Sequence, residues 1–212
     1  TRSYKDPGSP PFTILTKDSS LAALLDISGD FVASPPYLNA PENLRTTGAP
    51  QGKTHQFSLS SKEASIYNPG IARKVFGTPD PKNPKSLIVE THAIDFQRTI
   101  TVYIPAAYKS GTETPFMVTH DGPKVIGQIK KNLATVFDNL IAQKRIPSMV
   151  VISIANGGGD AQGSQRGREY DTMSGLFAEY IETHVLPEVE KLYQIKLTKD
   201  PNSRATMGNS SG

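Results

Sequence analysis

Residues 147–155, with the sequence PSMVVISIA, constrain the fold more than any other stretch of this chain. They are apolar almost without interruption, whereas a strand with one face in water alternates apolar and polar residues. A run of this kind is typical of a parallel strand that is covered on both faces. We therefore expect a central parallel sheet with helices packed against it.

Two segments with helical periodicity flank this strand. In residues 125–142 and 172–192, apolar residues recur every three or four positions, which predicts amphipathic helices. Pro187 should kink or divide the second helix, because proline lacks an amide hydrogen. With strands at 114–120 and 205–207, the order strand, helix, strand, helix, strand predicts an α/β fold with right-handed crossovers.

Antiparallel strands are expected to open the sheet. Residues 55–60 alternate, and residues 86–93 and 98–105 are rich in β-branched side chains, so all three are predicted strands. Residues 95–97 are predicted to form a hairpin turn between the last two. A short edge strand is expected at 71–75.

The first 52 residues carry weaker signals. They are rich in proline and poor in periodicity, so we expect a poorly ordered arm and loops. One or two turns of helix are predicted at 19–26, where a serine precedes an apolar run.

Composition removes several classes of function. The chain has no cysteine, which excludes disulfides, thiolate metal sites and a cysteine nucleophile. Its net charge of +3 comes from interleaved acids and bases, so no nucleic-acid partner is expected. No run approaches 18 apolar residues, so no membrane span is predicted. The four histidines lack the spacing of a zinc helix, and we expect neither a metal nor a cofactor.

The chemistry-bearing pattern is Gly-Asn-Ser-Ser-Gly at residues 208–212, which matches G-x-S-x-G. In a sharp turn from strand to helix, the two glycines remove Cβ atoms that would collide, and the strained backbone pushes the Ser210 hydroxyl outward. A carbonyl group can then reach this hydroxyl. The alternative interpretation is a Gly-Ser linker.

Three loops should meet at one edge of the sheet. Asp121-Gly122, Gly157-Gly158-Gly159 and Ser210 each follow a predicted parallel strand, and ligands bind at the carboxyl ends of such strands. The three glycines are predicted to form a tight turn beneath the pocket. A phosphate-binding loop is not favoured, because no G-K-[ST] follows them.

From about residue 52 to residue 212, the chain resembles the Putative esterase family of α/β-hydrolases. This family includes enterochelin esterases, S-formylglutathione hydrolases and feruloyl or acetylxylan esterases. Besides G-x-S-x-G, the resemblance rests on residues 98–105 with Tyr108, 121–122, 138–141, 145–147, 163–171 and 186–190. The R-x-x-E spacing of Arg166 and Glu169 is most similar to the enterochelin esterase branch.

The resemblance implies an α/β-hydrolase fold with a mostly parallel central sheet and antiparallel N-terminal strands, incomplete on its C-terminal side. Residues 1–52 would form an N-terminal arm with proline-rich loops. Residues 53–212 would form the N-terminal portion of the catalytic domain.

The resemblance also implies a carboxylic ester hydrolase whose nucleophile is Ser210, acting on a small-molecule ester. The Ser211 amide is expected to donate to the oxyanion. The second donor would be the Gly122 amide or a side chain such as Arg166, because the next residue is a proline. Asp121, Arg166 and Glu169 are candidates for supporting the substrate or the oxyanion. For Arg166 and Glu169 the alternative is a structural ion pair.

In this fold the acid and the base histidine follow the serine in sequence. His120 is therefore expected to pack near the site, while the base and the acid are expected beyond Gly212, in the remainder of the same protein or in a second chain. Without that remainder, residues 1–212 are expected to be unstable or prone to aggregation. Oligomeric state is not predicted.

Two other functions stay open: an acyltransferase of the same family, and a non-catalytic relative that binds a carbohydrate or a lipid. A first residue of Thr1 with no apolar leader fits an exported, processed protein or a trimmed chain. We expect a secreted or periplasmic location, with the cytoplasm as the alternative.

Overall fold

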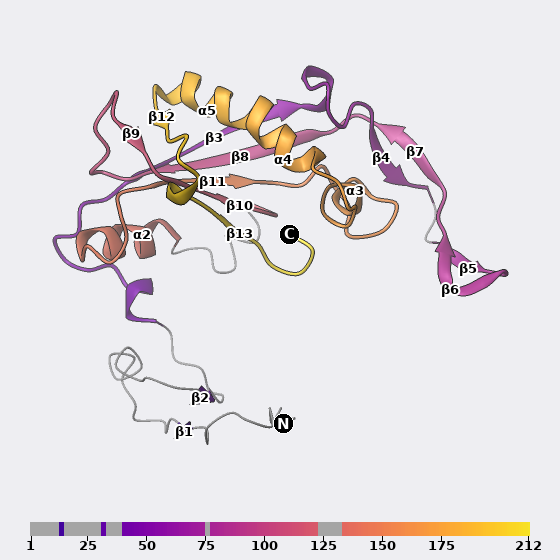
Figure 1. Ribbon diagram of the computed structural model, residues 1–212, viewed down its shortest axis with the longest axis horizontal. Coiled ribbons are helices and arrows are strands. Elements are labelled where there is room, and N and C mark those ends of the chain that lie inside the picture. Colours follow the sequence, from indigo (N-terminus) through magenta and orange to yellow (C-terminus); the bar gives the residue numbers. More distant parts are fainter. Residues whose placement is uncertain (1–12, 15–30, 33–39, 75–76, 123–132) are drawn as a thin grey trace.

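The computed structural model describes residues 13–14, 31–32, 40–74, 77–122 and 133–212 (Figure 1). Most of the expected N-terminal arm (residues 1–12, 15–30 and 33–39), the helix at 19–26 and the first part of the helix at 125–142 lie outside these residues. What is described is an α/β fold built on a mixed five-stranded sheet. Helices cover both faces of this sheet, with α2 on one face and α4 and α5 on the other (Figure 1).

The sheet has the order β13-β10-β11-β8-β3. These strands span Arg204–Met207, Phe116–Thr119, Val150–Ile154, Gln97–Ile104 and Lys53–Ser60. β10 is parallel to both β11 and β13, whereas β8 is antiparallel to β11 and to β3. The antiparallel opening strands are confirmed, but the described sheet is mixed and not mostly parallel, because two of its four pairings are antiparallel.

The order of the strands places a topological switch point at β10. The chain passes from β10 to β11 on one side and later returns to place β13 on the other side. Where the winding direction of a sheet reverses in this way, the loops at the carboxyl ends of the strands diverge and leave room for a ligand. The loops after β10, β11 and β13 therefore frame the candidate site.

β11 is buried at all five positions, as its apolar run predicts. On the side of α4 and α5, Ile152 and Ile154 pack into the main core, and on the side of α2, Val151 packs with Tyr103 and Phe137. Burial of this strand on both faces removes its apolar side chains from water. This hydrophobic burial is the main source of stability in such a fold.

The helices follow the predicted order with shifted bounds. They are α2 Leu133–Ala142, α3 Gln165–Tyr170, α4 Leu176–Tyr180 and α5 Leu186–Tyr193. A π-helical turn, η4 Ile181–Val185, joins α4 to α5. Pro187 does not divide this helical run, which continues without a break from residue 176 to residue 193. It lies in the first turn of α5, directly after the π-helical turn, where a missing amide hydrogen is tolerated.

α3 was not predicted from the sequence. Ser164 caps its first turn by accepting a hydrogen bond from the Gly167 amide at 3.2 Å. The helix has six residues, which is too short to show an apolar period. Its side chains nevertheless organise the candidate site, as described below.

An antiparallel arm extends beside α3 (Figure 1). It consists of two pairs, β4 Gly70–Arg73 with β7 Thr91–Ile94 and β5 Thr78–Asp80 with β6 Asn83–Ile88. The hairpin turn predicted at 95–97 is therefore wrong, because β7 pairs with β4 and not with β8. Both edges of β8 are already occupied by β3 and β11. The strand predicted at 86–93 is likewise divided into β6 and β7.

Several short elements complete the fold. They are β1 Thr13–Ile14, β2 Phe31–Val32, β9 Glu113–Thr114, β12 Lys196–Leu197, η1 Pro41–Asn43, η2 Ser61–Glu63 and η5 Pro201–Ser203. Buried Asn139 on α2 holds the segment around η1 by donating to the Glu42 and Leu44 carbonyls at 2.9 and 2.7 Å. It also accepts from the Thr46 amide at 3.2 Å.

Candidate active site

The turn after β13 places Ser210 in an uncommon backbone conformation. Its φ is +60°, a left-handed value that residues with a Cβ adopt only at some cost. A Cβ on Gly208 would collide with the Gly212 carbonyl, and the Gly212 amide donates to Asn209 O at 3.1 Å. The turn is therefore tight, and Ser210 lies exposed on it.

This turn lies against the corner at His120 and Asp121 that follows β10. A Cβ on Gly212 would lie 3.0 Å from Asp121 Oδ2 and 3.2 Å from His120 Cβ. The His120 amide also donates to Met207 O at 3.0 Å, extending the β10–β13 pairing. The structure thus brings the Ser210 turn and the Asp121 corner together.

Asp121 is held by several donors. Its carboxylate accepts from Arg166 Nε at 2.9 Å, from Arg166 Nη2 at 2.6 Å and from Asn156 Nδ2 at 2.7 Å. Its amide donates to the Tyr170 hydroxyl at 3.2 Å, and its φ is +55°. Burial raises the pKa of Asp121, but the bonds from Arg166 and Asn156 outweigh burial and leave the pKa lowered. Asp121 is therefore a fixed carboxylate.

The Gly122 amide is already engaged. It donates to Ile154 O at 3.0 Å, and a Cβ at this position would lie 2.7 Å from Ser153 Cβ. A donor to an oxyanion must point at the developing charge, whereas this amide is part of the sheet-end hydrogen bonding. The expectation that Gly122 donates to the oxyanion does not fit this geometry.

Arg166 and Glu169 take different partners, so the ion pair considered between them is not the one that forms. Arg166 pairs with Asp121 at 2.6 Å, and Glu169 pairs with Arg98 at 2.5 Å. Residues three positions apart lie on neighbouring parts of one helix face, yet here each side chain reaches a different partner. Sequence spacing alone could not separate these partners.

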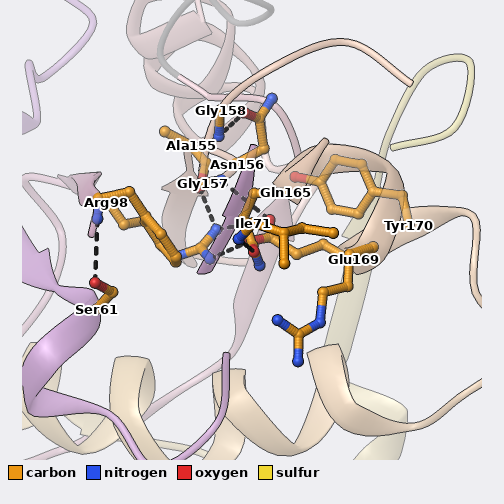
Figure 2. Close-up of polar contacts among 12 residues, drawn as sticks. Ser61, Ile71, Arg98, Ala155, Asn156, Gly157, Gly158, Gln165, Glu169 and Tyr170 are labelled. Atoms are coloured by element: carbon orange, nitrogen blue, oxygen red, sulfur yellow. Dashed lines mark hydrogen bonds and ion pairs between the residues drawn. The ribbon is translucent and has the colours of Figure 1, made fainter. Parts of the chain in front are cut away.

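Glu169 belongs to a buried network beneath the site (Figure 2). Arg98 Nη1 donates to Glu169 Oε2 at 2.9 Å and to Ala155 O at 2.6 Å. Gln165 Nε2 donates to Glu169 Oε1 at 2.8 Å, and the Gly157 amide donates to Oε2 at 3.2 Å. Neither charged side chain has exposed surface. The network fixes the end of β11 and the loop that follows.

Arg98 is the residue that sequence reasoning missed. It is the second residue of β8, in a run that otherwise reads as an ordinary half-buried strand. One signal could have identified Arg98: a positive charge at a core-facing position of a strand. A buried charge needs a partner, which a glutamate elsewhere in the chain could supply.

His120 lies beside Ser210's turn but is bound elsewhere. Its Nε2 and Thr206 Oγ1 are 2.8 Å apart, and its ring packs against Tyr170 and Phe177 with centroids 5.7 and 5.5 Å away. Burial lowers its pKa, against the opposing effect of Asp121. Among the described residues, no hydrogen bond joins His120 to Ser210. This arrangement agrees with the packing role expected for His120.

The glycine loop after β11 is a tight turn, as predicted. Gly158 and Gly159 have φ values of +119° and +81°, and the Arg166 amide donates to Gly158 O at 2.9 Å. The loop borders a cavity of about 330 Å³ whose other walls come from β4, β7 and Ser164. Within the ranges that the structure covers, no cluster of three acidic or histidine side chains could hold a metal ion. No helix there is long and apolar enough to cross a bilayer.

Comparison with known sequences identifies one family. The sequence profile described as Putative esterase matches residues 91–212. No protein with a curated description matches the chain.

Comparison with solved structures gives matches of low identity. A ferulic acid esterase is 19% identical, with a TM-score of 0.47, 76% of this chain covered and 50% of that chain. The feruloyl esterase module of Clostridium thermocellum is 14% identical, with a TM-score of 0.46 and coverages of 87% and 54%. The enterochelin esterase of Shigella flexneri is 20% identical, with a TM-score of 0.42 and coverages of 54% and 26%. The chain spans about half the length of the first two structures.

Proposed function

The chain belongs to the Putative esterase family, and from that premise we propose that the intact protein is a serine hydrolase of the α/β-hydrolase type. It would cleave a small carboxylic ester through an acyl-enzyme on Ser210. The observation that carries the proposal is the left-handed backbone of Ser210 on a tight, exposed turn at the carboxyl end of a parallel strand.

The proposed reaction has two halves. A base removes the proton of Ser210, and Oγ attacks the ester carbonyl carbon to give a tetrahedral oxyanion. By the family resemblance, the Ser211 amide, which directly follows the nucleophile, would donate to that oxyanion. The alcohol leaves with the proton, and water then releases the acid from the acyl-enzyme. By the family resemblance, base and acid come from residues outside 1–212.

The surrounding residues receive supporting roles. Glu169 has no exposed surface and is bound by Arg98, so we assign it to the scaffold and not to substrate contact. Asp121 lies at the edge of the turn that carries Ser210, next to Gly212. His120, already bound to Thr206, packs beneath the turn.

Labelling of the full-length protein tests this function. A fluorophosphonate probe should label the wild type on Ser210, and Ser210→Ala should abolish both labelling and p-nitrophenyl acetate turnover. Ser211→Ala is the matched control: it changes the neighbouring exposed side chain but keeps the amide, so labelling should persist. Undiminished turnover in Ser210→Ala would reject the proposal.

A further inference from the structure

β3 lies at one edge of the five-stranded sheet and pairs only with β8 (Figure 1). The pairing is regular over all eight residues, with no bulge. The strand contains no proline, and Lys53 is its only lysine, arginine, aspartate or glutamate. Natural edge strands are usually short, or protected by bulges, prolines or several charges, because their free backbone groups pair readily with another strand. β3 has almost none of these protections.

The direction of the backbone groups of β3 follows from the hydrogen bonds at its two ends. In antiparallel pairing, residues that bond to the neighbouring strand alternate with residues that point away from it. The Ser61 amide continues the ladder by donating at 2.9 Å to the residue before β8. The Gly52 amide donates instead to Asp138 Oδ1 at 2.8 Å, and the Ser60 amide to Glu63 Oε2 at 3.4 Å. Odd-numbered residues therefore face β8, and even-numbered residues point away from it.

Three residues are left with free backbone groups at this edge, namely Thr54, Gln56 and Ser58. Nothing in the described part of the chain hydrogen-bonds to their amides. In an antiparallel second copy of β3 with the two Gln56 residues opposite each other, Thr54 of each copy would pair with Ser58 of the other. Each such pair exchanges two hydrogen bonds, so all six amides would gain an acceptor. Gly52 and Ser60 would keep the side-chain partners that they already have.

The aromatic side chains on the α5 side of β3 suit the same register. His55 and Phe57 both pack on Tyr193, with ring centroids 4.9 and 6.2 Å away. In the paired strands, His55 of each copy would lie opposite Phe57 of the other. That position is not hydrogen-bonded, so the side chains approach closely, and aromatic pairs across strands are stabilising. Six rings from the two copies would form one cluster.

Charge also favours a second copy of this chain as the partner. A groove of about 620 Å³ lies beside the second half of β3, and Leu59, Glu63, Glu188 and Lys191 are among its lining residues. Glu188 pairs with Lys191 at 3.2 Å, whereas Glu63 has no ion-pair partner among the described residues. In the register centred on Gln56, Lys53 of the second copy would lie opposite Leu59. Its ammonium group would then enter a groove that holds an unpaired carboxylate.

We propose that β3 is a dimer interface, in which two copies of the chain pair through this strand about a two-fold axis at Gln56 and join their sheets into one. The interface is isologous, because the same residues serve in both copies. β13, which leads to Ser210, lies at the opposite edge of the described sheet. The proposal therefore does not depend on the proposed function.

Cross-linking of the full-length protein tests the register. Residues 1–212 contain no cysteine, and any cysteine in the remainder would be replaced by serine. In Gln56→Cys, the two Cα atoms should be about 5.5 Å apart, which a disulfide spans. Oxidation with diamide should therefore give a covalent dimer on a gel without reductant.

Ser58→Cys is the matched control for cross-linking. The residue is exposed on the same strand, but its two copies would be about 13 Å apart, too far for a disulfide. This variant should stay monomeric on the same gel. Absence of the covalent dimer in Gln56→Cys, or an equal yield in both variants, would overturn the proposal.

Analytical ultracentrifugation of the full-length protein gives a second test. The wild type should sediment with twice the mass of one chain and dissociate on dilution. Gln56→Pro removes the central amide from both copies at an edge position where proline is tolerated, so it should be monomeric. Gln56→Thr keeps the amide and should remain a dimer. A wild type that is monomeric at every concentration would overturn the proposal, as would equal dissociation constants for the wild type and Gln56→Pro.

A charge variant keeps this test decisive if circular dichroism shows that Gln56→Pro is unfolded. Lys53→Glu changes an exposed side chain at the start of β3 and would place like charges in each groove. It should raise the dissociation constant of the dimer roughly 10-fold or more. Lys53→Glu combined with Glu63→Lys should recover part of the loss, since the charges are exchanged. An unchanged dissociation constant in Lys53→Glu would overturn the proposal.

Discussion

Arg98 and Glu169 form an ion pair with no exposed surface on either side chain, in which Arg98 Nη2 lies 2.5 Å from Glu169 Oε1. Strand β8 supplies the arginine and α3 supplies the glutamate, so the pair joins the sheet to the helix that borders the candidate site. The rings of Phe96, Phe177 and Tyr180 surround the guanidinium at 4.7 to 5.7 Å. This enclosure excludes water, so removal of one partner would leave the other as an uncompensated buried charge.

We predict that Glu169→Gln lowers the free energy of unfolding by about 3 to 5 kcal/mol, because it leaves a buried arginine without its counter-charge. Urea unfolding measures this loss. The double variant Arg98→Met, Glu169→Leu should be more stable than Glu169→Gln, since it removes both charges together. Lys191→Ala, which breaks an exposed pair with Glu188, should cost less than about 1 kcal/mol. A loss of that small size in Glu169→Gln would contradict the role given to the pair.

Asn139→Ala should be destabilising by about 2 to 3 kcal/mol. The side chain satisfies two carbonyl groups and one amide of residues 42–46, and its removal leaves partly buried polar groups without partners. Gln143→Ala changes an exposed amide one turn further along and should stay within about 0.5 kcal/mol of the wild type. Thermal unfolding of both variants makes the comparison. Equal melting temperatures would show that water replaces Asn139 without cost.

The protonation of His120 should contribute to the pH dependence of the free energy of unfolding. Burial lowers its pKa in the folded state below the ordinary value of 6.5, so the unfolded chain binds a proton first as the pH falls. Stability is therefore full above pH 6.5 and is lost as the pH drops toward the folded-state pKa. His120→Gln should flatten this part of the profile, measured by urea unfolding between about pH 5 and 7. His92→Gln, on exposed β7, should not. An unchanged slope in His120→Gln would rule out His120 as the source.

The parallel core was predictable because its signal is local. The nearly continuous apolar run around β11 indicates cover on both faces, and the structure buries every residue of β11. Pro187 was less informative, because the helical run passes through it by way of a π-helical turn that ends just before α5. The same local logic predicted a strained serine between two glycines, and Ser210 has a φ of +60°.

The remaining features depend on contacts between residues that are far apart in the sequence, and a single sequence does not reveal such contacts. Nothing near Glu169 shows that its partner is Arg98, 71 positions earlier, and not Arg166, three positions away. The failed hairpin at 95–97 has the same cause. Residues 86–93 and 98–105 both have the composition of strands, but β8 pairs with β3 and β11 instead. The hydrogen bond from the Gly122 amide to Ile154 O could not be predicted either, because Ile154 belongs to the next strand.

Gly157→Ala should destabilise the protein by about 1 to 3 kcal/mol, the usual cost of overpacking. A Cβ there would collide with Gln165 Cγ and lie 2.8 Å from Glu169 Oε1 and 2.9 Å from Phe96 Cε2, so it would push apart the network that fixes the loop. Gly175→Ala is the matched control, because nothing lies within 4 Å of its Cβ position and its φ is −82°. Its stability should stay within about 1 kcal/mol of the wild type.

A double variant separates local crowding from damage to the buried network. If the Cβ at position 157 acts through Gln165, then Gln165→Ala should make room for it, and the cost of Gly157→Ala should fall when it is measured in that background. Both costs come from urea unfolding at one pH. Equal costs in the two backgrounds would place the strain in the backbone of the glycine loop. The close approach of α3 would then not explain why position 157 needs glycine.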